Sequence, residues 1–128
     1  YLSYSGVRGM TSDCVNKVKR LFETDPLKAQ EIDTRMREAV SSCEAALLDS
    51  SSGAFENLRV ALSMAGSCFA DWGLSDGDLG RHLNELTRAG AVAVKPTGSG
   101  GGGFALSLWT GAPPEHLLAR LIPVPGEK

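Results

Sequence analysis

Apolar residues recur every three or four positions along much of the chain, which is the spacing of one face of an α-helix. The first such segment follows Thr11, Ser12 and Asp13, whose side chains are typical of a helix N-cap. Its apolar positions are Val15, Val18, Leu21 and Phe22. We therefore predict a helix that begins at these caps and ends before Pro26.

Two longer helical patterns follow this segment. Asp25 and Pro26 are the residue types preferred at an N-cap and at the first helical position, so they predict the start of the second helix. Its apolar stripe is Ile32, Met36, Ala39, Val40, Cys43 and Leu47. After a predicted turn at 49–53, the stripe of the third helix is Phe55, Leu58, Leu62, Ala65, Phe69 and Trp72. We expect both stripes to face the core.

A fourth helix is predicted after the glycine-containing break at 73–78. Ser75 and Asp78 have the spacing of a capping box, with aspartate in the place of glutamate. The inward positions of this helix are Leu79, Leu83 and Leu86. Gly90 has the residue type preferred just after a helix C-terminus.

Short alternating or β-branched runs predict strands at residues 1–5, 91–95 and 104–109. A short fifth helix follows the prolines at 113–114, and residues 121–125 predict a last strand, which Pro123 confines to an edge. Strands and helices do not alternate strictly, so we expect an α+β sandwich of ferredoxin-like shape. It has about four antiparallel strands with helices packed on one face, as a single domain over residues 1–128.

Composition and charge narrow the function classes. The chain has 13 basic and 15 acidic residues, a net charge of −2. This balance argues against a nucleic-acid partner, and the sequence has no basic helix suited to a membrane surface. The apolar runs are also too short to span a bilayer. The chain begins at Tyr1, inside a predicted strand, which favours a piece of a longer protein.

The three cysteines, Cys14, Cys43 and Cys68, form no CxxC pair, so the sequence predicts no zinc site. Each lies among apolar residues in a helical pattern, and we expect reduced, buried thiols in a cytoplasmic protein. His82 and His116 lie in polar sequence surroundings, which gives little support to a cysteine–histidine catalytic pair.

Residues 95–104, KPTGSGGGGF, contain five glycines, four of them consecutive. A flexible linker would explain them, but this segment joins two predicted strands of one domain. Gly98, Gly100 and Gly103 match a dinucleotide-binding G-x-G-x-x-G, but a strand follows where that motif needs a helix. The third interpretation is a loop whose amides form a nest for an anion, with hydroxyls from Thr97 and Ser99.

The segment KPTGSGGGGFALSL resembles the third conserved motif of the GHMP kinases, a superfamily named for galactokinase, homoserine kinase, mevalonate kinase and phosphomevalonate kinase. Mevalonate kinases carry a form like K-x-T-G-A-G-G-G-G-C before a short apolar strand. The matching residues are Lys95, Thr97, Gly98, Gly100, Gly101, Gly102 and Gly103. Ser99 replaces the usual alanine, and Phe104 replaces the usual cysteine or aspartate. Segments 5–18 and 73–95 are also similar to the family, so the resemblance covers nearly the whole chain.

The resemblance implies the C-terminal domain of an ATP- and Mg²⁺-dependent kinase that transfers the γ-phosphate to a hydroxyl group. Mevalonate is the first expected acceptor, and phosphomevalonate or a sugar is the alternative. The N-terminal domain of the same chain would be the partner. It would supply the catalytic residues and bind most of the ATP and Mg²⁺, so this fragment alone would be inactive.

The resemblance also implies the residues of the site. The phosphate end of the ATP cleft would be lined by Gly98, Ser99, Gly100, Gly101, Gly102 and Gly103. The acceptor would contact Thr97, Thr11 and Ser12. Helix capping is the competing interpretation for Thr11 and Ser12, and a solvated charge at a strand end is the competing interpretation for Lys95. A non-catalytic binding or regulatory domain remains the alternative function, and an exposed helix face would serve a homodimer.

Overall fold

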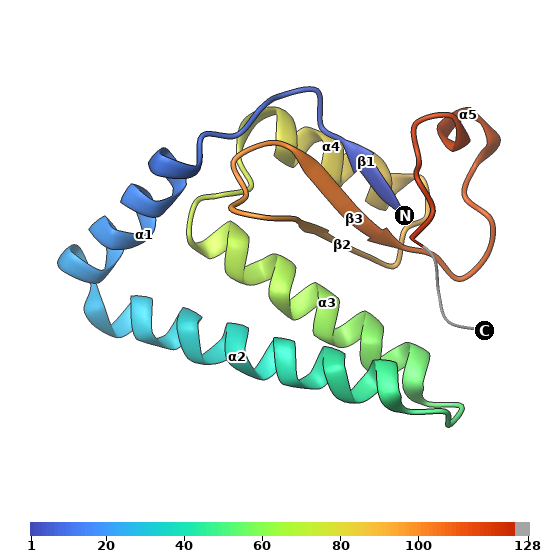
Figure 1. Ribbon diagram of the computed structural model, residues 1–128, viewed down its shortest axis with the longest axis horizontal. Coiled ribbons are helices and arrows are strands. Elements are labelled where there is room, and N and C mark those ends of the chain that lie inside the picture. The colour runs from blue at the N-terminus through green and yellow to red at the C-terminus, as the bar shows by residue number, and fades with distance from the viewer. Residues whose placement is uncertain (125–128) are drawn as a thin grey trace.

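The computed structural model describes residues 1–124, in which three strands form one antiparallel sheet of order β1–β3–β2 (Figure 1). Leu2 pairs with Leu106 across β1 and β3, and Lys95 pairs with Leu106 across β2 and β3. The elements in chain order are β1 (Leu2–Tyr4), α1 (Thr11–Thr24), α2 (Pro26–Leu48), α3 (Ala54–Asp71), α4 (Gly77–Arg88), β2 (Ala93–Pro96), β3 (Phe104–Leu108) and α5 (Glu115–Leu118).

The predicted ferredoxin-like sandwich of about four strands is wrong. Most of the chain is helical, and the sheet has three short strands. The predicted strand at 121–125 contributes, within the described residues, one bridge between Leu2 and Ile122, closed by backbone hydrogen bonds of 2.8 and 2.7 Å. Pro123 follows this bridge and has no N–H to extend a ladder. Residue 125 of that prediction lies outside the described residues.

Two long helices form a pair that packs against the sheet. α2 and α3 pack side by side, joined by the turn at 49–53, and α3 also packs along the edge strand β2 (Figure 1). Asp25 caps α2 as predicted, because its carboxylate accepts a hydrogen bond from the amide of Lys28 at 3.3 Å.

Over residues 1–124, no helix combines the length and the apolar character that a membrane crossing requires.

The buried face of the sheet carries small residues. Ala105 and Ser107 of β3 are buried, whereas Phe104 on the opposite face is 40% exposed. α4 packs on this sheet, and its Leu86 lies in one core cluster with Ala105. The other buried members of that cluster are Ala91, Leu117 and Leu121. Small side chains on β3 therefore let the helical layer approach the strands closely.

Several predicted details of the helices are wrong. On α2, Val40 and Leu47 are exposed, while Ala29 and Ala46 are buried in their place. The N-caps of α1 and α4 are Met10 and Asp76, and neither makes a side-chain capping hydrogen bond. The predicted caps Thr11, Ser12 and Asp13 instead lie inside the first turn of α1.

His82 of α4 is buried, contrary to the polar surroundings that we expected. Its Nε2 lies 2.7 Å from the hydroxyl of Ser3, which is fully buried on β1, and its Nδ1 lies 3.2 Å from a carboxylate oxygen of Glu85. Arg120 donates two hydrogen bonds to the same carboxylate and holds the pKa of Glu85 below its ordinary value. This chain of contacts ties β1, α4 and the segment after α5 together.

We expect His82→Ala to lower the free energy of unfolding by about 1–3 kcal/mol, because it leaves the buried Ser3 hydroxyl without its partner. His116 is exposed on α5 and provides the matched control, whose replacement by alanine should change stability by less than about 0.5 kcal/mol. Urea unfolding curves of the two variants measure both values. Equal effects of the two substitutions would contradict the role given to His82.

Candidate functional site

The loop at 97–103 connects β2 to β3 and is fixed on two sides by other parts of the chain. The amide of Gly103 donates to the carbonyl of Val7 at 2.7 Å, and that of Gly101 donates to the carbonyl of Leu74 at 2.6 Å. The hydroxyl of Thr97 donates to the carbonyl of Phe104 at 2.9 Å and closes the base of the loop. The glycine run is therefore an anchored turn within one sheet and not a flexible linker.

Packing explains why side chains are missing from this loop. A Cβ atom on Gly102 would lie 2.6 Å from the nitrogen of Gly9 and 2.7 Å from the carbonyl oxygen of Val7. A Cβ on Gly9 would in turn lie 2.7 Å from the carbonyl oxygen of Gly100. Gly100 also has a φ of 76°, in the left-handed region that favours glycine. The backbones around Gly9 and Gly102 thus lie so close together that a side chain at either position would not fit.

The hydrogen bonds divide the loop amides into two sets. The amides of Gly100, Gly101 and Gly103 donate within the chain, so they are not free to hold an anion. The amides of Gly98, Ser99 and Gly102 have no acceptor among residues 1–124. Gly102 is buried under the backbone of residues 7–9, so the expected phosphate-lining set is reduced to two accessible amide donors, those of exposed Gly98 and half-buried Ser99.

The first turn of α1 lies against the same loop. The hydroxyl oxygens of Thr11 and Ser99 are 3.4 Å apart, although the two residues are separated by 88 positions in the sequence. Because α1 has no side-chain cap, the amide end of its dipole stays open beside this pair of hydroxyls. Ser12 is exposed in the same turn. The capping interpretation of Thr11 and Ser12 is therefore wrong.

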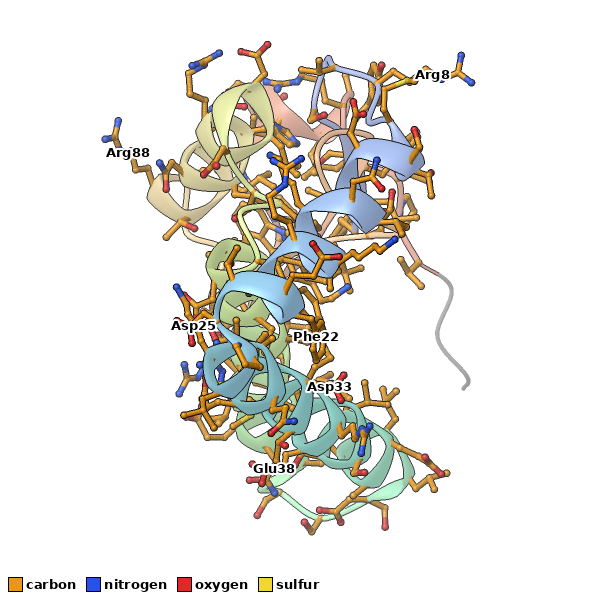
Figure 2. The ribbon with its side chains drawn as sticks, turned by 90° about the vertical axis from the view of Figure 1, so that its left-hand side faces the viewer. Arg8, Phe22, Asp25, Asp33, Glu38 and Arg88 are labelled. Carbon is orange, nitrogen blue, oxygen red and sulfur yellow. The ribbon has the colours of Figure 1, made fainter. Side chains whose placement is uncertain are left out.

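Two basic residues near the loop, Lys95 and Arg8, differ in exposure. Lys95 is half-buried, donates from Nζ to the carbonyl of Pro96 at 2.6 Å, and lies 5.4 Å from the ring centre of Phe69. Burial lowers its pKa, so the expectation of a solvated charge is wrong. Arg8 is exposed, and Figure 2 shows its side chain extending away from the body of the molecule.

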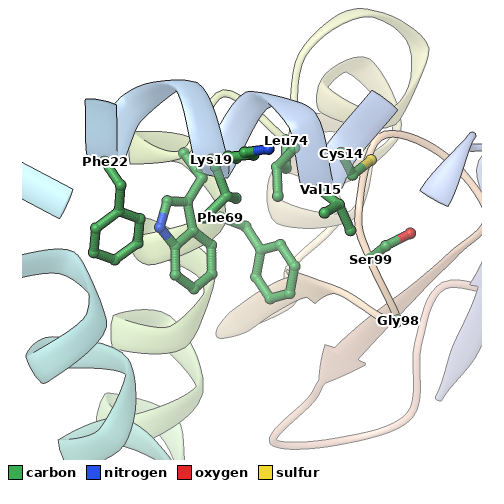
Figure 3. A pocket seen from close by; sticks show the side chains of 10 residues that line it. Cys14, Val15, Lys19, Phe22, Phe69, Leu74, Gly98 and Ser99 are labelled. Carbon is green, nitrogen blue, oxygen red and sulfur yellow. The ribbon is translucent and has the colours of Figure 1, made fainter. Parts of the chain in front are cut away.

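A groove of about 530 Å³ begins at the loop and runs between α1 and the end of α3 (Figure 3). Gly98 and Ser99 form one end of it. The sequence pattern did not indicate this groove, because it predicted the apolar stripe of α1 without showing which of its positions stay exposed. The structure buries only Cys14 of α1, and the exposed part of that stripe was not visible from spacing alone. The groove is lined by Cys14, Val15, Val18, Lys19, Phe22, Phe69, Trp72, Leu74, Gly98 and Ser99.

The three cysteines are free thiols, and Cys14 and Cys68 are buried while Cys43 is half-buried. Across residues 1–124, no group of three or more histidine, cysteine or acidic side chains is arranged to hold a metal ion. Comparison with known proteins gave no match: no protein-family model fits the chain, and no curated protein or solved structure is significantly similar to it.

We expect Gly102→Ala to destabilise the fold by about 1–3 kcal/mol, since the added methyl group would overlap the backbone of residues 7–9. Gly111 is the matched control, because a Cβ there meets no atom within 4 Å. Its replacement by alanine should cost less than about 0.5 kcal/mol. Urea unfolding measures both, and a Gly102→Ala protein as stable as Gly111→Ala would show that the two backbones do not meet closely.

Lys95 predicts a pH dependence of stability. Its pKa is lowered by burial in the folded state, whereas the unfolded chain titrates near the ordinary value of 10.5. Between these two pKa values the unfolded state binds more protons, so stability rises with pH. The stability of the protein relative to Lys95→Met should therefore increase as the pH approaches 10.5 from neutral. Urea unfolding across that range provides the measurement, and a pH-independent difference would refute the assignment.

Proposed function

We propose that this chain is the C-terminal domain of a cytoplasmic GHMP-type kinase that transfers the γ-phosphate of ATP to a hydroxyl group. Mevalonate is the proposed acceptor, because the loop is most similar to the mevalonate kinase form of the motif. The observation that carries the proposal is a group of polar groups where the loop meets the first turn of α1. It comprises the amides of Gly98 and Ser99, which have no acceptor among residues 1–124, and the hydroxyls of Thr11 and Ser99, which lie 3.4 Å apart.

Phosphoryl transfer depends mainly on positioning and on stabilising negative charge at the phosphate oxygens. Amides and hydroxyls without other partners can donate to phosphate oxygens, and the open N-terminus of α1 adds a favourable dipole. Such donors do not themselves perform the chemistry. We therefore propose that an N-terminal domain of the same polypeptide supplies the catalytic residues and most of the contacts to ATP and Mg²⁺.

The hydrogen bonds modify the roles that the resemblance implies. The hydroxyl proton of Thr97 is used to close the loop, which makes Thr97 a weaker candidate for the acceptor contact than Thr11 or Ser12. Gly100 and Gly101 would act by packing rather than by donating to phosphate. Phosphomevalonate or a sugar would use the same donors, so the acceptor has to be identified by assay.

The test is a kinase assay of the full-length polypeptide with ATP, Mg²⁺ and a panel of acceptors that includes mevalonate, phosphomevalonate and sugars. We expect phosphorylation of mevalonate, and a loss of about 10- to 100-fold in kcat/KM for the double variant Thr11→Val with Ser99→Ala. This range corresponds to the loss of a hydrogen bond to a charged group. Both side chains are at the surface or half-buried, so the variant should fold.

Thr34→Val provides the control, since Thr34 is exposed on α2 and far along the chain from the loop. Its kcat/KM should match that of the unmodified protein. Absence of turnover with every acceptor would favour the alternative of a non-catalytic binding or regulatory domain. If the double variant phosphorylates the acceptor as well as the unmodified protein does, the proposed site is excluded but the kinase activity is not.

A further inference from the structure

The groove between α1 and α3 exposes apolar surface that the proposed kinase function does not use. Val15 is 58% exposed and Phe22 is 41% exposed, although both belong to the apolar stripe of α1. Phe69 and Trp72 also line the groove, and their rings meet edge to face at 5.6 Å. Figure 3 shows Phe69 between α1 and the sheet. Leaving such surface in water is unfavourable in proportion to its area, so a ligand that covers it gains free energy.

The polar groups of the groove are few and restrict the kind of ligand. Lys19 is the only charged residue of its lining, is exposed, and forms no ion pair within the described part of the chain. Ser99 contributes the only hydroxyl, at the end next to the glycine loop. A ligand that complements this lining therefore has an apolar body and one negative charge.

The length of the groove limits the size of the apolar body. The lining residues of α1 run from Cys14 to Phe22, a rise of about 12 Å along the helix axis. An extended aliphatic chain of about ten carbons has the same length, and a volume of about 530 Å³ lies within the range of small-molecule sites.

We infer that this groove binds a medium-chain aliphatic carboxylate, with its chain between α1 and the Phe69–Trp72 pair and its carboxylate at Lys19. The inference does not depend on the kinase proposal, because it needs neither nucleotide nor turnover. A bound chain would reach Gly98 and Ser99, so the groove would share one wall with the glycine loop.

The test uses decanoate as the probe and the full-length polypeptide without nucleotide. Calorimetric titration should give saturable binding of decanoate, and Lys19→Gln should weaken it about fivefold, as expected for an exposed charge pair of about 1 kcal/mol. Decylamine, which has the same chain and the opposite charge, should bind more weakly than decanoate. Lys28→Gln is the matched control, since Lys28 is exposed on α2, outside the groove, and its loss should leave the affinity unchanged.

A decanoate analogue with a photoreactive diazirine at its chain end locates the ligand. Labels on the peptides that contain residues 14–22 or 69–74 would support the inference. Labels elsewhere, equal affinity for decylamine, or the absence of saturable binding would overturn it. A dimer in sedimentation experiments that Val18→Asp dissociates would also overturn it, by assigning the groove to a second copy of the chain.

Discussion

The contact between the backbones of Gly9 and Gly102 is the constraint on which the rest of the site depends. Neither position has room for a Cβ atom, and the hydrogen bond from Gly103 to Val7 fixes the two segments in register. Because residue 9 lies just before α1, this contact also sets where the helix begins. The first turn of α1 is consequently held beside Ser99, which is 88 positions from Thr11 in the sequence.

The same constraint decides which donors remain for a ligand. The amides that anchor the loop donate within the chain and Gly102 is buried, so the accessible amides without an acceptor are those of Gly98 and Ser99. The glycine run thus has a structural explanation at Gly100 and Gly102, and a proposed functional one at Gly98 and Ser99. The two explanations are complementary, since free amides can serve a phosphate only if their neighbours keep the loop in one conformation.

Periodicity predicted the helices well but only some of the side chains that they bury, among them Ile32, Phe69 and Leu86. The apolar spacing placed α1 to α4, the prolines at 113–114 indicated α5, and the residue types Asp25 and Pro26 placed the start of α2. On α2 the predicted stripe is wrong at Val40 and Leu47, which are exposed while alanines are buried, because close helix packing favours small residues over the most hydrophobic ones. The prediction of a fourth strand is wrong. Ile122 forms a single bridge with Leu2, and Pro123 after it has no N–H to extend a ladder. His82 could not be identified, since its partner Ser3 is 79 residues away. For the site, the glycine run and Thr11 were predicted from sequence, whereas the division of the amides depends on tertiary contacts that no local pattern contains.

The most direct measurement of the central claim is the amide NMR spectrum of the full-length polypeptide, recorded with and without a non-hydrolysable ATP analogue and Mg²⁺. We expect shifts at the amides of Gly98 and Ser99, while the amides of Gly101 and Gly103 exchange slowly with solvent in both states. Shifts confined to other parts of the chain, or fast exchange at Gly101 and Gly103, would contradict it.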